Sequence, residues 1–167
     1  MQRMLSGLLL LGLLGLLAGC GESPPTLPSD TVAGTADSPA VILTLAPSAD
    51  TFLNQAAPGA ADGLAMVLPC GNYPTGARKR DLFRFYLNQI PAGTTITSAY
   101  LYLYVIRVNQ GTDRYTLHRV TSAWGETTAT WLSHSAAYAV VASAVRTIDS
   151  TMAGTWARFD VKNLVQS

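Results

Sequence analysis

Apolar and polar residues alternate with a period of two over most of the chain beyond residue 40, as in β-strands that bury one face. The clearest case is residues 97–108, where aliphatic side chains alternate with three tyrosines. Residues 81–87 alternate in the same way, with phenylalanines on one face. The other predicted strands are 41–45, 64–68, 115–120, 139–144 and 155–161. Because turns separate these short strands and no helical stripe interrupts them, the pattern predicts an all-β fold, an antiparallel, jelly-roll-like β-sandwich.

The N-terminus has a different pattern. Arg3 precedes an apolar run over residues 4–17, which is shorter than the ~20 residues of a membrane-spanning helix. The run closes on Leu17-Ala18-Gly19-Cys20, the order in which a bacterial lipoprotein signal ends. We therefore expect cleavage after residue 19 and lipidation of Cys20, with membrane lipid as a partner and a location outside the cytoplasm, at the outer membrane or cell surface.

Residues 20–40 are rich in Pro, Ser and Thr and contain no aromatic residue. Such a composition cannot bury enough apolar surface to offset the entropy of ordering, so we expect a disordered linker. The remaining residues, 41–167, suit one domain with a real core.

Charge and cysteine content limit the function. Without residues 1–19 the chain has ten basic and ten acidic residues, which argues against nucleic acid as a partner. Cys70 is the only cysteine besides Cys20, so a disulfide framework and a cysteine-based metal site are both excluded. We expect Cys70 to pack against its neighbours or to sit in a loop as a spare thiol, rather than act as a nucleophile.

Several blocks along the domain, taken in order, resemble the DNRLRE domain. This is an extracellular β-sandwich related to disaggregatase-type repeats and to an alginate-binding carbohydrate-module family. The blocks are Ala49-Asp50-Thr51-Phe52, Leu82-Phe83-Arg84-Phe85, residues 90–103, residues 120–131 with Trp124-Gly125-Glu126 and Thr130-Trp131, and residues 156–166 with Phe159-Asp160-Val161. The resemblance implies carbohydrate binding. It also implies further strands after the Leu164-Val165-Gln166 segment, so by this comparison the C-terminal strands are missing. Residues 61–63 read Ala-Asp-Gly where the family usually has Asn-Tyr-Gly.

Tyr100, Tyr102 and Tyr104 are the first candidate binding residues, because side chains two apart in a strand project from one face. Such a row could stack on sugar rings, and Arg84 and Tyr86 could join it if their strand lies alongside. The alternative is that the tyrosines make cross-strand pairs beneath a loop.

Trp124, Glu126 and Trp131 form the most distinctive local pattern. Glu126 is the only glutamate in the domain, and a general acid usually works with a second carboxylate that the spacing does not supply. We expect the tryptophans to anchor a loop and Glu126 to accept backbone or arginine hydrogen bonds. Phe159 and Asp160 belong to the same structural motif by resemblance.

Other polar groups are less informative. Residues 78–80, Arg-Lys-Arg, suit a solvated loop, an anionic polysaccharide or a lipid headgroup. Asp50, Asp62 and Asp160 could hold a structural calcium ion, although no Asp-x-Asp-x-Asp spacing supports one. The two histidines fit no catalytic motif.

The sequence thus predicts a non-catalytic, lipid-anchored surface protein that binds carbohydrate, such as an acidic polysaccharide. A structural or adhesive envelope module without a sugar site is the alternative. An enzyme would require a cleft that joins Glu126 to a second carboxylate. Ligand identity and oligomeric state do not follow from these residues.

Overall fold

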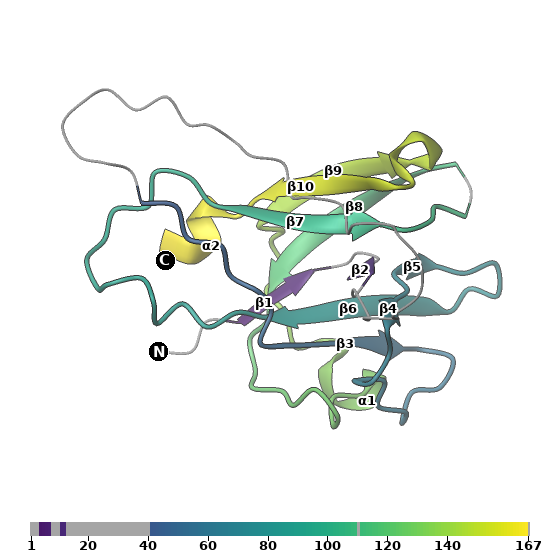
Figure 1. Cartoon of the computed structure of the whole chain (residues 1–167). Helices are drawn as coiled ribbons and strands as arrows, with labels where there is room; N and C mark the ends of the chain where they lie inside the picture. Colours follow the sequence, from purple (N-terminus) through teal and green to yellow (C-terminus); the bar gives the residue numbers. More distant parts are fainter. Residues whose placement is uncertain (1–3, 8–10, 13–40, 110, 167) are drawn as a thin grey trace, which may run out of the picture.

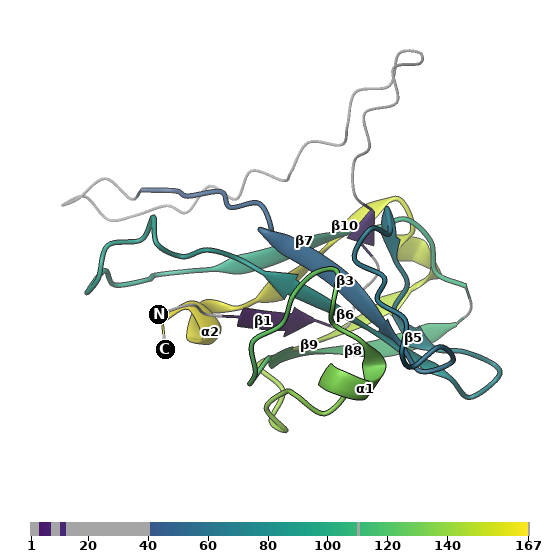
Figure 2. The same cartoon turned by 90° about the horizontal axis from the view of Figure 1, so that it is seen from below.

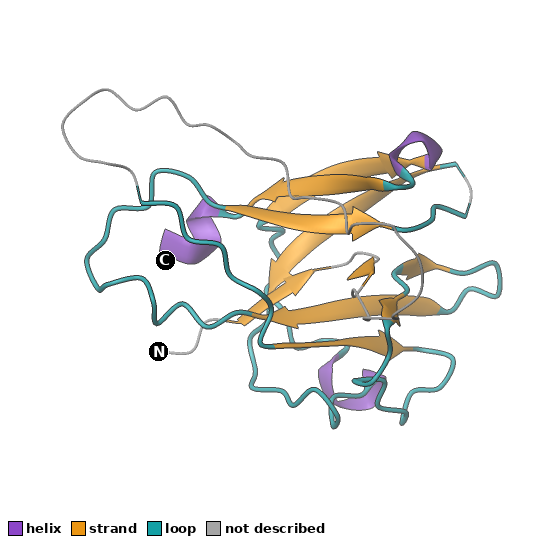
Figure 3. Ribbon diagram, in the orientation of Figure 1, coloured by secondary structure: helices purple, strands orange, loops and turns teal. Residues whose placement is uncertain are grey.

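The structure is a computed structural model, and it describes residues 4–7, 11–12, 41–109 and 111–166. Cys20 and the linker 20–40 lie outside the described residues, as does most of the predicted signal 1–19. Strands and loops make up nearly all of the described chain (Figure 3). Within it, no helix has the length and apolar character needed to cross a membrane.

The larger sheet is wholly antiparallel, with strand order β3-β6-β1-β8-β9 (Figure 1). A short strand, β5, pairs with β6 outside this path. The members are β1 (Met4–Gly7), β3 (Ala49–Asn54), β5 (Gly71–Asn72), β6 (Arg78–Arg84), β8 (Thr112–Arg119) and β9 (Ala144–Asp149).

A smaller antiparallel sheet joins β7 (Tyr100–Val105) to β10 (Thr155–Asp160) and forms the opposing layer. A further pair joins β2 (Leu11–Gly12) to β4 (Val67–Leu68). Within the described ranges, helical structure is confined to α1 (Trp131–His134), a 3-10 turn (Ser150–Met152) and α2 (Lys162–Gln166). The predicted all-β sandwich is therefore confirmed.

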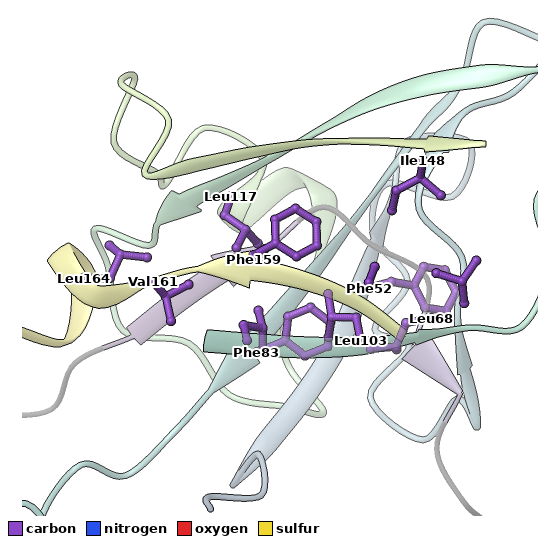
Figure 4. Packing of buried hydrophobic residues seen from close by; sticks show 12 residues of the cluster. Phe52, Leu68, Phe83, Leu103, Leu117, Ile148, Phe159, Val161 and Leu164 are labelled. Atoms are coloured by element: carbon purple, nitrogen blue, oxygen red, sulfur yellow. The ribbon is translucent and has the colours of Figure 1, made fainter. Parts of the chain in front are cut away.

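The main core fills the space between the two sheets (Figure 4). Leu103 and Phe159 enter it from the small sheet, and Phe83 and Leu117 enter it from the large sheet, each at most 2% exposed. Alternate positions of β7 are buried, namely Leu101, Leu103 and Val105, which confirms the period-two pattern.

A second apolar cluster covers the other face of the large sheet. Leu53 and Leu82 contribute from β3 and β6, and Trp124 and Ala129 contribute from the loop that carries α1. Viewed from below, this loop lies beneath β3 and β6 (Figure 2). The outer face of the large sheet is therefore partly covered, whereas β7 and β10 carry no such loop among the described residues.

Three predicted strands differ from the structure. Residues 41–45 pair with no described strand, because β-branched composition forms a strand only where a neighbour supplies a ladder. Residues 64–68 are a strand only at β4, since a turn bond from the Ala65 amide to the Asp62 carbonyl precedes it. Residues 139–143 form no strand after a single bridge at Tyr138, and pairing resumes at β9, which begins at Ala144.

Candidate functional site

The tyrosine row lies on the outer face of the small sheet. Tyr100, Tyr102 and Tyr104 occupy the positions of β7 between the buried aliphatic residues, so their rings point away from the core. Tyr100 is 38% exposed, and the other two rings are partly exposed. Tyr100 and Tyr102 meet edge to face, with 6.4 Å between ring centroids. The row is therefore open to solvent rather than covered by a described segment.

Strand β10 adds an aromatic ring and a cation to this row. The register places Trp156 opposite Tyr104 and Arg158 opposite Tyr102. The indole of Trp156 packs edge to face on Tyr104 at 5.2 Å, and the guanidinium of Arg158 lies 4.5 Å from the ring centroid of Tyr100. These five residues form one continuous surface, which we call the tyrosine face.

Trp156 and Arg158 were missed as site residues by sequence reasoning. They alternate with the buried Ala157 and Phe159, so their outward direction could have been read from the pattern. The pairing of β10 with β7 could not be read from the pattern, because it joins distant parts of the chain.

Arg84 and Tyr86 do not join the tyrosine face, because Arg84 ends strand β6 of the large sheet and Tyr86 lies two residues beyond it. The Arg84 guanidinium lies 5.1 Å from the Trp124 ring and 5.9 Å from the Tyr86 ring. Arg84 Nη1 also donates to the Trp124 carbonyl at 3.0 Å. The expected neighbourhood of these two residues with the tyrosine row is thus corrected: Arg84 fastens the loop that covers the large sheet.

Glu126 contacts backbone in that same loop. Its Oε1 accepts the backbone N–H of Asp50 at 3.1 Å, so the carboxylate ties the loop to the start of β3. Gly63 packs directly against the Glu126 backbone, where an added Cβ would lie 2.0 Å from the carbonyl oxygen. Burial, with a smaller effect of the nearby Glu126 charge, raises the pKa of Asp50. Glu126 is thus a hydrogen-bond acceptor that holds the loop to the start of β3.

The remaining members of the predicted structural motif lie at packing or capping positions. Trp124 is 5% exposed, and Trp131 packs partly against the same cluster. Phe159 is in the main core. Asp160 Oδ1 accepts the Lys162 amide at 3.0 Å, at the start of α2.

A cleft of about 300 Å³ opens on the outer face of the large sheet. The Arg80 guanidinium lies between the rings of Trp131 and Tyr138, at 5.1 and 4.8 Å, and donates to the Ser135 carbonyl. His118 packs edge to face on Tyr138, with 5.0 Å between ring centroids, and contacts the Ala139 carbonyl through Nδ1 at 2.8 Å. The cleft is lined by Gly71, Asn72, Arg78, Lys79, Arg80, Thr116, His118, Tyr138 and Val140.

Two other predicted chemistries can be placed. Cys70 is buried as a free thiol, and burial together with the Asp81 charge raises its pKa well above the ordinary value, so it remains protonated. Among the described residues, no group of three or more His, Cys, Asp or Glu side chains could hold a metal ion, and this includes Asp50, Asp62 and Asp160.

Glu126 and Asp50 are carboxylates close enough for their charges to interact. The cleft described above is lined by neither of them. Neither Glu126 nor Asp50 lines a second cleft, which lies near Asp160 and Lys162. The arrangement that would favour an enzyme, a cleft joining Glu126 to another carboxylate, is thus not formed by either of these two clefts.

Comparison with known proteins identifies the domain. Residues 41–167 match carbohydrate-binding module family 96. No curated protein and no solved structure matches the chain significantly. The match covers the whole predicted domain and agrees with the carbohydrate-module part of the resemblance, whereas the DNRLRE assignment stays a prediction. The chain therefore belongs to carbohydrate-binding module family 96.

Proposed function

We propose that this carbohydrate-binding module holds a polysaccharide on the tyrosine face, and that acidic sugars are preferred. The observation that carries the proposal is the gathering of four aromatic rings and one guanidinium on one open side of the small sheet. On the large sheet, by contrast, Arg84 packs on Trp124, which is buried in the second cluster.

The chemistry of the face suits sugar rings. Aromatic faces pack against the C–H surfaces of pyranose rings, and the tyrosine hydroxyls supply hydrogen-bond partners. Side chains two apart on β7 are spaced by about 7 Å, so neighbouring rings would meet successive parts of an extended polymer. Arg158 is the cation of this face, and a guanidinium pairs well with the carboxylate of a uronic acid.

Two tyrosine variants test the placement. Tyr102→Ala removes the central ring of the tyrosine face, while Tyr86→Ala removes an exposed ring just beyond the end of β6. Titration with one acidic and one neutral polysaccharide should show weaker binding by roughly tenfold for Tyr102→Ala, about the contribution of one stacked ring. Tyr86→Ala should bind as the parent does. The reverse result would place the site near the end of β6, and full binding by both variants would favour the structural or adhesive alternative.

We further propose that Cys20 carries lipid and that the domain works outside the cytoplasm, tethered to a membrane. The support is the Leu17-Ala18-Gly19-Cys20 order and the apolar run before it. Intact mass of the protein recovered from membranes should show loss of residues 1–19 and addition of acyl chains. A Cys20→Ser variant should retain residues 1–19, and a parent protein with an unmodified N-terminus would overturn the proposal.

We propose that the module is non-catalytic. The support is the use of Glu126 as an acceptor for a backbone amide and the buried, protonated state of Cys70. Incubation with the polysaccharide that it binds should release no new reducing ends or unsaturated products. Release that is lost in Glu126→Gln would instead show an enzyme.

A further inference from the structure

The large sheet contains one strand from the extreme N-terminus. β1 pairs antiparallel with β6 on one side and with β8 on the other (Figure 1). The register sets Leu5 opposite Phe83 and Ser6 opposite His118. In the strand order of the sheet, β6 and β8 are joined only through β1. We call the position between β6 and β8 the strand slot.

The same residues belong to the segment that lipoprotein processing would remove. Met4–Gly7 lies inside residues 1–19, which end at the predicted cleavage site. Without them, the facing edges of β6 and β8 would carry backbone groups that lack ladder partners. Phe83 and Leu117 would be affected as well, since both are core residues on the strands that border the slot. The processed domain therefore needs another strand in this position.

The slot is short. β1 covers Asp81–Arg84 of β6 and Leu117–Arg119 of β8. Beyond it, Lys79 pairs with Asn54 of β3 and with Gly71 of β5, so β5 occupies the slot side of β6 from that point. An incoming strand thus has room for about four or five residues between the start of the slot and β5.

One described segment has the composition of the required strand. Residues 41–45, Val-Ile-Leu-Thr-Leu, form the β-branched run that was predicted to be a strand and that pairs with no described strand. Val41 is 81% exposed, Ile42 is 76% exposed and Leu43 is 46% exposed. Its alternate residues Val41, Leu43 and Leu45 are all aliphatic, as one core-facing side of a strand requires.

These residues cannot reach the slot of their own copy. Ser48 is fixed at the start of β3, where its amide donates to the Arg84 carbonyl at 2.7 Å. β3 and the slot lie on opposite sides of β6, about 10 Å apart, and the far end of the slot is about 10 Å further along the strand. In a strand that runs antiparallel to β6, as β1 does, residue 45 would lie at this far end, about 14 Å from Ser48, while three residue steps span only about 10 Å.

We propose that removal of residues 1–19 opens the strand slot and that residues 41–45 of a second copy fill it, giving a strand-exchanged dimer. Strand addition at an open sheet edge and exchange of an element between copies are both established ways to complete a sheet. The proposal rests on the processing proposed above and is independent of the sugar site.

The test compares two forms of the full-length gene product in the same detergent. The parent is processed, and Cys20→Ala, which lacks the lipidated residue, keeps its leader. Native mass spectrometry should show a dimer that lacks residues 1–19 for the parent and a monomer for Cys20→Ala. Amide hydrogen exchange should show protection at Asp81–Arg84 and Leu117–Arg119 in both forms, because the slot is filled by a different strand in each.

Matched variants of the processed protein identify the occupant. Leu43→Lys places a charge in the middle of the donated strand and should give a monomer with fast exchange at the slot. Leu132→Lys changes a residue that is 75% exposed on α1 and should leave the dimer intact. A parent protein that is processed yet monomeric would overturn the proposal. So would a dimer that survives Leu43→Lys, or a parent that retains residues 1–19, and polysaccharide binding on the tyrosine face could persist in all three cases.

Discussion

The two outer faces of the sandwich use the same residue types for different purposes. On the large sheet, Arg84 packs on Trp124, which is 5% exposed, and donates to its carbonyl, so the pair fastens a loop. On the small sheet, the exposed Arg158 lies on Tyr100, which is 38% exposed. An arginine stacked on an aromatic ring is thus not by itself a sign of a binding site. Whether other parts of the chain cover the arginine and the ring distinguishes a structural pair from a pair on an open surface.

The two faces should differ most in the loss of stability when one tryptophan is removed from each. Trp124→Ala empties a site in the second cluster and should lower the free energy of unfolding by about 3–5 kcal/mol. Trp156→Ala removes a partly exposed ring and should cost clearly less. Urea denaturation of both variants measures the difference. Equal losses would mean that the tyrosine face is also a structural cluster.

The contact of the covering loop with the segment between β3 and β4 can be probed through two glycines of that segment. Gly63→Ala would place a Cβ 2.0 Å from the Glu126 carbonyl oxygen, and we expect a loss of about 1–3 kcal/mol from overpacking. Gly59→Ala is the matched control, since nothing lies within 4 Å of its added Cβ. Thermal unfolding should show a lower Tm for Gly63→Ala alone. A shift of the same size in both would mean that the loss comes from the glycine backbone rather than from the close contact with Glu126.

Local pattern was sufficient to predict one part of the site. The outward direction of Tyr100, Tyr102 and Tyr104 follows from a period of two, which depends only on neighbouring residues. The location of Arg84 was not predictable in this way, because the choice of β10 rather than β6 as the neighbour of β7 depends on long-range pairing. Residues 41–45 illustrate the same limit, since strong strand composition gave no strand without a neighbour.

Arg158→Gln tests whether the arginine on the open face pairs with the acidic group of a sugar. Loss of the guanidinium should weaken binding of a uronic-acid polymer by roughly tenfold, which corresponds to about 1.4 kcal/mol, and should leave a neutral polymer nearly unaffected. Stability should change by less than about 0.5 kcal/mol, because the side chain is exposed. Isothermal titration with both polymers measures the selectivity. Equal loss for the two would show that Arg158 positions Tyr100 rather than pairing with the acidic group.

The smallest expected effect concerns pH and Asp50, beneath the covering loop. Its pKa is raised above 3.8, first by burial and then by the Glu126 charge. A carboxyl group that binds its proton more tightly when folded favours the folded state while it is protonated, so this contribution is present below pH 3.8 and is lost as the pH rises through the raised pKa. Asp50→Asn removes the titrating group and should therefore gain stability at pH 7 relative to the parent. At pH 3 the variant should show no such gain.

Urea denaturation of the two proteins at both pH values measures this difference. Asp149→Asn is the opposite case, because hydrogen bonds from Thr151 lower the pKa of Asp149, so that variant should lose stability at pH 7. A gain in stability for Asp50→Asn of the same size at both pH values would mean that the gain comes from better packing of the side chain rather than from removal of a buried charge. The charges of Asp50 and Glu126 would then have no measurable effect on stability. The contrast between the covered face and the open face would rest on packing, not on electrostatics.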